Sequence, residues 1–102
     1  MNEEVKIQSN DFWVKIVEFL QQNWALIDEH ENNTIVWFIH DASGVFDKLE
    51  FKNHNDAIIG LEKNGFKRYL DPTENFTEFI IPPKRPFFNS PKNIYSSGKY
   101  WK

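Results

Sequence analysis

Apolar and polar residues follow two different periods along this chain, and each period predicts a kind of element. The first pattern begins at Ser9-Asn10-Asp11, whose side-chain oxygens favour a helix start because they accept first-turn N–H groups. Apolar residues then recur at helical spacing, which is typical of one buried stripe. We therefore predict an amphipathic helix over residues 9–23. Its stripe consists of Phe12, Trp13, Ile16, Val17 and Leu20.

A meander of three strands is predicted next. Residues 24–27 and 34–40 are apolar runs separated by the polar stretch 28–33. Asp41-Ala-Ser-Gly44 is a turn sequence, in which Gly44 can adopt a positive φ. Residues 45–51 then alternate between apolar and polar side chains, which is the period of a strand.

A second helix carries signals at both of its ends. Asn53 is a plausible N-cap, and Asp56 stands three residues later, as in a capping box. Gly65 can take the left-handed conformation that ends a helix, and Phe66 would then pack on Leu61. We predict a helix over residues 53–64, with Ala57, Ile58 and Leu61 buried.

A final hairpin is expected from residues 66–70 and 76–81, with Pro82-Pro83 ending its second strand because proline has no N–H to donate. The expected order is therefore α-β-β-β-α-β-β. This order predicts a single domain of the α+β class, in which two helices cover one face of an antiparallel sheet and a C-terminal arm follows.

The predicted sheet has two apolar faces. If the 41–44 turn closes a regular hairpin, His40 pairs with Val45, Phe38 with Asp47 and Val36 with Leu49. The face for the helices then carries Ala25, Ile27, Val36, Phe38, Val45, Leu49 and Phe51. The other face carries Trp24, Leu26, Ile35, Trp37, Ile39 and Phe46. An apolar face of this size is unusual in contact with water. We therefore expect the arm, a second copy of the chain or a partner to cover it. A one-residue bulge near Gly44 would exchange the faces of the third strand.

Charge divides the chain at Pro82-Pro83. All fifteen acidic residues and seven of the twelve basic residues lie in 1–82, whereas 83–102 holds the other five basic residues and no acid. The second segment is also more aromatic than disordered chains are. We therefore predict an acidic globular body over 1–82 and a basic aromatic arm over 83–102 that packs on the body. The aromatic residues of the arm are Phe87, Phe88, Tyr95, Tyr100 and Trp101.

Composition excludes several classes of protein. The chain has no cysteine, so it forms no disulfide framework and no Cys-based metal site. Its N-terminus lacks the apolar stretch of a secretory signal, and its longest apolar runs are far too short to span a membrane. We expect a small soluble protein of the cytoplasm.

Candidate catalytic and metal-binding residues are few. His40, Asp41 and Ser43 supply the groups of a nucleophilic triad, but neighbours in a turn rarely reach that geometry. Glu29-His30-Glu31 and His54 offer metal ligands, although adjacent loop residues usually point apart. We favour a turn and a solvated loop, and we expect no enzyme activity, cofactor or metal.

Two functions remain from the sequence. The favoured one is a non-enzymatic protein-interaction module, such as an inhibitor, an adaptor or a neutralising partner of a basic protein, acting as a monomer or a homodimer. The alternative is an accessory protein that binds single-stranded nucleic acid through residues 83–102, because basic and aromatic side chains alternate there. The candidate partner-binding residues are Trp24, Trp37, Phe46, Arg85, Phe87, Phe88, Tyr100 and Trp101.

Overall fold

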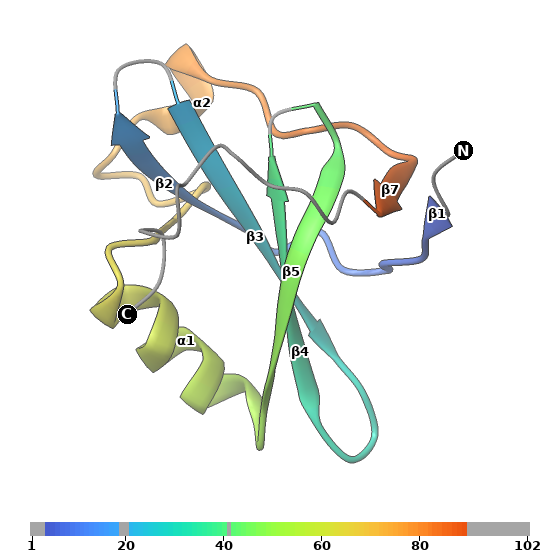
Figure 1. The fold of residues 1–102 in the computed structure, drawn as a ribbon. Helices are drawn as coiled ribbons and strands as arrows, with labels where there is room; N and C mark the ends of the chain where they lie inside the picture. Colours follow the sequence, from blue (N-terminus) through green and yellow to red (C-terminus); the bar gives the residue numbers. More distant parts are fainter. Residues whose placement is uncertain (1–3, 19–20, 41, 90–102) are drawn as a thin grey trace.

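A seven-stranded mixed sheet forms the centre of the protein (Figure 1). The computed structural model describes residues 4–18, 21–40 and 42–89. The strands are β1 (Glu4–Val5), β2 (Phe12–Glu18), β3 (Gln21–Glu29), β4 (Thr34–His40), β5 (Gly44–Phe51), β6 (Lys67–Arg68) and β7 (Phe87–Asn89), and the helices are α1 (His54–Lys63) and α2 (Phe76–Phe79). The strand order is β1-β7-β5-β4-β3-β2-β6, and the β5–β7 pair is parallel, so the prediction of a wholly antiparallel sheet is wrong. The α+β class is consistent with this arrangement.

The predicted first helix is wrong, because residues 12–18 form β2 and residues 21–29 form β3, which pairs with it. Trp13 pairs with Ala25 and Val14 pairs with Trp24 in antiparallel register. Trp13 and Val14 are consecutive and both buried, one on each face of the sheet. A single helical stripe cannot bury two neighbours on opposite sides, whereas a strand covered on both faces does so. The aromatic and β-branched residues of this segment also favour a strand.

The predicted register between β4 and β5 is confirmed from Thr34↔Phe51 to Phe38↔Asp47. It then shifts, because Ile39 lies opposite Val45 and Phe46 is the extra residue of a bulge. The predicted pair of His40 with Val45 is therefore wrong, and so are the faces predicted for Val45 and Phe46.

The 41–44 turn also differs from its prediction. Ser43, not Gly44, takes the left-handed conformation, with φ of 69°. Its carbonyl oxygen accepts a hydrogen bond from the backbone N–H of Phe88 at 3.0 Å. This bond ties the end of the β4–β5 hairpin to β7. Asp41, the first residue of the predicted turn, lies outside the described residues.

Both ends of α1 confirm the sequence prediction. The side chain of Asn53 accepts a hydrogen bond from the backbone N–H of Asp56 at 2.8 Å. At the other end Gly65 has φ of 87°, and the N–H of Phe66 donates to the carbonyl oxygen of Leu61 at 3.0 Å. This six-to-one bond is that of a Schellman motif, and it turns Phe66 back onto the helix.

Replacing Gly65 by alanine should lower the free energy of unfolding by about 1 kcal/mol, because a Cβ disfavours the positive φ. For a domain of this size, that loss corresponds to a melting temperature lower by about 4–8 °C. Asparagine tolerates the left-handed region better, so Gly65→Asn should lose less than Gly65→Ala. Equal melting temperatures for the three proteins in a thermal scan would contradict the assigned C-cap.

The predicted final hairpin is wrong. Lys67 and Arg68 pair with Val14 and Trp13 of β2, and residues 76–79 form the short helix α2 instead of a strand. The hairpin prediction depended on the helix predicted at residues 9–23. Once those residues form β2, its outer edge is available to β6. Pro82-Pro83 consequently ends no strand.

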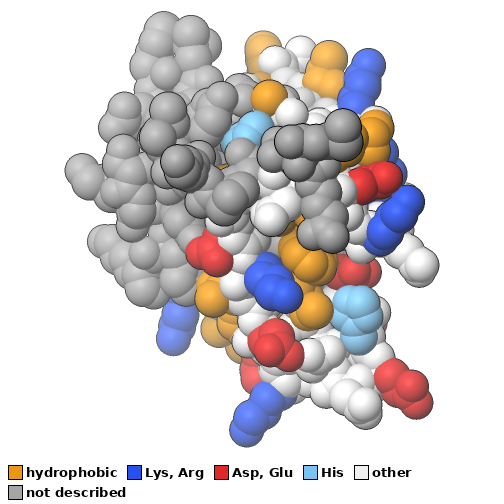
Figure 2. Space-filling view, turned by 45° about the vertical axis from the view of Figure 1, so that its right-hand side comes forward, with side chains coloured by type: hydrophobic (Ala, Val, Ile, Leu, Met, Phe, Trp, Pro, Cys, Tyr) orange, Lys and Arg blue, Asp and Glu red, His pale blue; other side chains and the backbone are white. Residues whose placement is uncertain are grey.

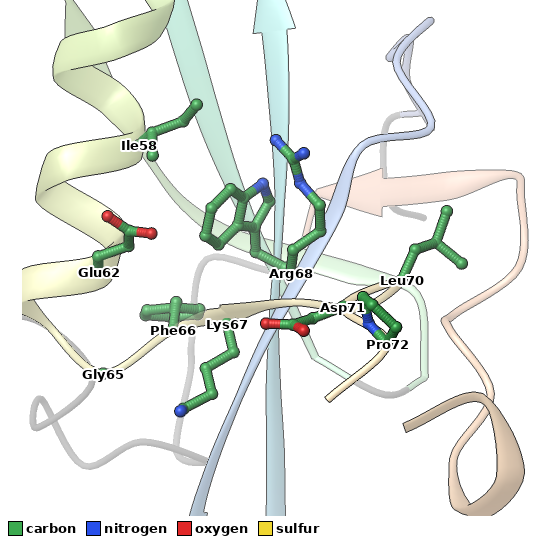
Figure 3. A pocket seen from close by; sticks show the side chains of 10 residues that line it. Ile58, Glu62, Gly65, Phe66, Lys67, Arg68, Leu70, Asp71 and Pro72 are labelled. Carbon is green, nitrogen blue, oxygen red and sulfur yellow. The ribbon is translucent and has the colours of Figure 1, made fainter. Parts of the chain in front are cut away.

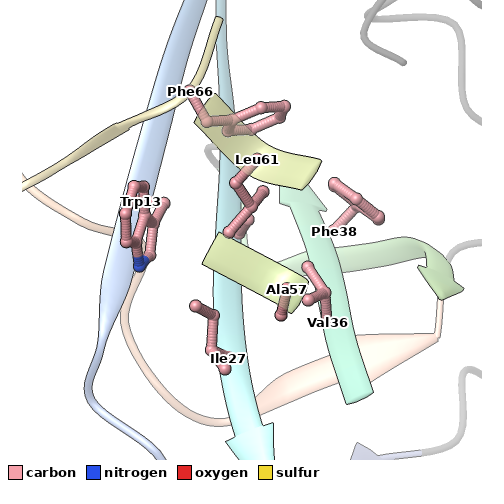
Figure 4. Packing of buried hydrophobic residues seen from close by; sticks show 8 residues of the cluster. Trp13, Ile27, Val36, Phe38, Ala57, Leu61 and Phe66 are labelled. Carbon is pink, nitrogen blue, oxygen red and sulfur yellow. The ribbon is translucent and has the colours of Figure 1, made fainter. Parts of the chain in front are cut away.

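Two clusters of buried side chains lie on opposite faces of the sheet. The first lies under α1, which lays Ala57 and Leu61 on the sheet (Figure 4). Its members are Trp13, Ala25, Ile27, Val36, Phe38, Ala57, Leu61 and Phe66. The second consists of Ile7, Val14, Trp24, Leu26, Ile39, Val45 and Phe87.

The two helices lie on opposite faces, which corrects the prediction that both cover one face. Phe76 of α2 and the following Ile80 pack against the second cluster, and so does Tyr69. Ile7 and Phe87 are members of that cluster. Its cover among the described residues therefore comes from the N-terminal segment, from α2 and from the first part of residues 83–102.

Candidate functional site

The three apolar residues predicted to share a binding face do not form one surface. Trp24 is wholly buried, with its ring centroid 5.9 Å from that of Phe12 and 5.4 Å from that of Tyr69. Trp37 is half-buried on the same face as Trp24. Phe46 packs against the first cluster, on the other face, because of the bulge. Trp24 belongs to the core.

Phe87 and Phe88 differ sharply in exposure. Phe87 is 1% exposed within the second cluster, and Phe88 is 38% exposed. Both belong to β7, which pairs with β1 and β5. Phe87 is therefore a core residue, and of these two only Phe88 presents surface. Tyr100 and Trp101 lie outside the described residues.

Arg85 holds the N-terminal segment in place. Its guanidinium donates to the carbonyl oxygen of Ile7 at 2.8 and 3.2 Å, to that of Ser9 at 2.6 Å and to Oδ1 of Asn10 at 2.9 Å. The same group lies 5.2 Å from the ring centroid of Phe87. These contacts give Arg85 a structural role.

The candidate triad is not assembled among the described residues. The hydroxyl of Ser43 donates to the carbonyl oxygen of Lys84 at 2.5 Å, and Nδ1 of His40 accepts from the backbone N–H of Ala42 at 3.1 Å. The His40 contact is local to the turn, and the Ser43 contact joins the turn to the segment before β7. Asp41, the third candidate, is not described.

Among the candidate metal ligands, the two histidines contact nearby carboxylates. Nδ1 of His54 contacts Oε1 of Glu29, and its Nε2 lies 3.8 Å from Oδ2 of Asp11. Nε2 of His30 lies 3.3 Å from Oδ2 of Asp28. In the described part of the chain, no group of three His, Asp or Glu side chains is arranged to hold a metal ion. His54 links the start of α1 to the sheet.

A hollow of about 830 Å³ lies between α1 and the chain that follows it (Figure 3). We call it the Trp13 groove. Apolar side chains come from both of its sides, Ile58 from α1 and Leu70 from the facing segment, and Trp13 of β2 also lines it. The residues that line it are Trp13, Ile58, Glu62, Gly65, Phe66, Lys67, Arg68, Leu70, Asp71 and Pro72.

The indole of Trp13 carries an unsatisfied donor beside the groove. Trp13 is 3% exposed, and its buried Nε1 has no hydrogen-bond partner in the part of the chain that the structure describes. The guanidinium carbon of Arg68 lies 5.1 Å from its ring centroid. A buried donor without an acceptor costs stability, so an acceptor that reached it would be favoured.

The basic side chains of the groove are neutralised by neighbouring carboxylates. Nζ of Lys67 lies 3.1 Å from Oε2 of Glu74, and Nε of Arg68 lies 3.4 Å from Oδ1 of Asp11. The charge left at the rim therefore depends on the two acidic residues that line the groove.

Glu62 and Asp71 give the rim of the groove a negative character. They lie on opposite sides of it, Glu62 on α1 and Asp71 on the facing segment (Figure 3). Glu62 has no ion pair among the described residues. The backbone N–H and the hydroxyl of Thr73 donate to Asp71 at 2.9 and 2.8 Å and hold the pKa of that carboxyl below its usual range. Glu62 therefore faces the groove without a described cation, and Asp71 does so with the positive charge of Lys67 nearby.

A second hollow, of about 480 Å³, adjoins the groove, and we call it the Tyr69 hollow. Its lining residues are Asn10, Asp11, Phe12, Arg68, Tyr69, Leu70 and Pro82. Arg68 and Leu70 line both hollows. Leu70 is 69% exposed, and in the same 70–82 segment Phe79 and Ile81 are 78% and 74% exposed. We call this region, the two hollows with residues 67–72, the β6 edge.

A third hollow, of about 470 Å³, lies away from this edge, and we call it the Trp37 hollow. It is lined by Glu4, Val5, Trp37, Val45, Phe46, Asp47, Lys48 and Asn89. Nζ of Lys48 lies 5.4 Å from the ring centroid of Trp37. It therefore includes Trp37 and Phe46, two of the predicted partner-binding residues.

The β6 edge was not predicted from the sequence. Residues 66–70 and 76–81 were predicted to form a hairpin, in which their side chains would alternate between two faces. A signal against that hairpin is the apolar run Phe79-Ile80-Ile81, because three successive apolar residues cannot all face one side of a strand.

No family model, curated protein or solved structure matches this chain. Among the described residues, no helix has the length and apolar character needed to cross a membrane. In the view of Figure 2, acidic and basic side chains are interspersed among apolar ones, without a large area of one sign. Geometry and surface chemistry are therefore the basis for a functional proposal.

Proposed function

We propose that this chain is a non-enzymatic protein-binding module that holds a segment of its partner against the β6 edge. The observation that supports this function is the exposure of Leu70. This side chain is 69% exposed, and it lines both the Trp13 groove and the Tyr69 hollow. Large apolar side chains grouped on an exposed surface mark sites of association. Phe79 and Ile81 add to the apolar surface of the neighbouring segment.

The chemistry of the groove indicates the kind of segment that it binds. Its apolar lining accepts a large apolar or aromatic side chain, and its volume of about 830 Å³ leaves ample room for one. Glu62 and Asp71 on its opposite sides favour a lysine or arginine beside that anchor. A site that favours a basic partner fits an inhibitor or a neutralising partner of a basic protein.

Binding of single-stranded nucleic acid through residues 83–102 stays a prediction. Arg85 is engaged with three neighbours of the N-terminal segment, and Lys67 and Arg68 are paired with carboxylates. These described basic side chains are therefore not arranged as a strip for phosphates, which supports the protein partner.

Leu70→Asp should weaken binding of a groove peptide at least about tenfold, since burying a leucine is worth about 1.5–3 kcal/mol. The peptides would be selected from a displayed random library on the full chain, and their affinities measured by fluorescence anisotropy. The matched control is Ile59→Asp, because Ile59 is 44% exposed on α1 and lines none of the hollows at the β6 edge. The proposal predicts selected peptides with an aromatic residue next to a basic one.

Equal losses for the two variants would contradict a site at Leu70, because the effect would then be a general one of added charge. A library that yields no binding peptide would contradict the proposed function as a whole. Both variants should keep the wild-type melting temperature, since the substituted side chains are exposed.

A further inference from the structure

We infer that residues 90–102 of this chain are an intramolecular ligand of the Trp13 groove, so that the chain occupies its own binding site. The inference rests on the proposed function, because it names one occupant of the same site. Residue 89 is the last that the structure describes, and thirteen residues follow it. They comprise Ser90-Pro-Lys-Asn-Ile-Tyr95-Ser-Ser-Gly-Lys-Tyr100-Trp-Lys102.

The chemistry of this segment complements that of the groove. Lys99-Tyr100-Trp101-Lys102 places two aromatic side chains between two cations, and residues 90–102 contain no acid. The groove offers apolar walls and carboxylates on opposite sides, from Glu62 and Asp71 (Figure 3). An indole in the groove would bury a large apolar area, and the flanking lysines would face the two carboxylates.

The segment is long enough to reach the groove. The strand order places β7 five strand positions from β6, which is about 24 Å across the sheet. The twelve residues from 90 to 101 span up to about 40 Å when extended. The surplus lets the segment pass around side chains that lie between the two strands.

The tether makes weak binding sufficient. A segment attached to its own site experiences an effective concentration in the millimolar range, so contacts too weak to bind a free peptide still fill the groove. A partner must then displace the segment, and its apparent affinity falls by the fraction of chains in which the groove is open. The C-terminal segment would therefore regulate binding at the β6 edge.

A nitroxide on residue 97 tests this inference in the full chain. The protein has no cysteine, so Ser97→Cys gives a single labelling site. The expected result is paramagnetic broadening of the backbone amides of Gly65, Leu70 and Asp71, which line the groove. The control amides are those of Glu31 and Asn32 in the β3–β4 loop, which should keep their intensity.

Adding Trp101→Ser to the labelled chain should restore the amide signals at the groove, because the anchor is lost. The same substitution in the unlabelled chain should raise the affinity of a library-selected groove peptide several-fold. Broadening that is absent from Gly65, Leu70 and Asp71, or that survives Trp101→Ser, would overturn the inference.

Two further results distinguish this inference from binding between two copies of the chain and from the proposed function. In the first, spin-labelled chain without isotope is mixed with isotope-enriched chain without a spin label. Equal broadening in that mixture would mean that a second copy supplies the segment, which overturns the intramolecular form. If a library peptide binds the groove while the spin label has no effect there, the inference is wrong and the proposed function stands. If no peptide binds either, the proposed function fails as well.

Discussion

Replacing Phe87 by alanine should lower the free energy of unfolding by about 3–5 kcal/mol. Phe87 is 1% exposed and belongs to the cluster on the second face of the sheet, together with the wholly buried Trp24 and Leu26. β7 lies between β1 and β5, and β5 is itself paired with β4, so this part of the sheet has little freedom to close the space that the ring leaves. The loss should therefore include most of a cavity penalty.

Phe88→Ala is the matched control, because it removes the same ring from the next residue of the same strand. Phe88 is 38% exposed, so its substitution should cost much less. Chemical denaturation of both variants measures the difference. Similar losses would mean that β7 does not close the second cluster, and residues 83–89 would then be separate from the folded body.

Arg85→Ala should cost about 1.5–3 kcal/mol of stability, which is the range for hydrogen bonds made by a charged group. Its guanidinium donates to two backbone carbonyl groups, of Ile7 and Ser9, and to the side chain of Asn10. Without Arg85, those carbonyl oxygens lose their donors and Ile7 loses the clamp that holds it in the second cluster.

The control for this change is Lys84→Ala, since only the backbone carbonyl of Lys84 makes a described contact, with Ser43. Arg85→Lys should recover only part of the stability, because an ammonium cannot form the same forked set of bonds. Denaturant unfolding gives the three free energies, and the carbonyl carbon chemical shifts of Ile7 and Ser9 locate the effect, because Arg85 donates to these two groups. Wild-type carbonyl shifts at Ile7 and Ser9 in Arg85→Ala would contradict the clamp.

Local signals were sufficient to predict α1. Its N-cap at Asn53 and its C-cap at Gly65 depend on side chains within a few residues of each end, so no distant contact decides them. The register of β4 with β5 was predictable for the same reason, as far as Phe38↔Asp47. The bulge at Phe46 was not, because it depends on which cluster each of Val45 and Phe46 joins.

The β2 strand shows why the first element was mispredicted. Residues 12–20 contain apolar residues at helical spacing, and they also contain the adjacent pair Trp13-Val14. Pairing with β3 decides between the two patterns, because it buries both members of that pair. This is a tertiary effect, and it overrides local periodicity.

The β6 edge could not be predicted from the sequence. The exposure of Leu70 follows from where β6 and α2 are placed, and both placements depend on β2 being a strand. Trp24 and Phe87 were predicted to bind a partner because they are large and apolar. The same properties favour their burial, and both lie in the core. Size and hydrophobicity alone do not separate a core residue from an anchor for a partner.

The most direct test of the binding account is an amide chemical-shift map of the isotope-labelled full chain, titrated with a library-selected peptide. The account predicts that the largest shifts fall at the β6 edge, on Gly65, Arg68, Leu70 and Asp71, whereas Val5, Trp37 and Val45 around the Trp37 hollow stay unchanged. Shifts centred on the Trp37 hollow, with the β6 edge unaffected, would contradict it.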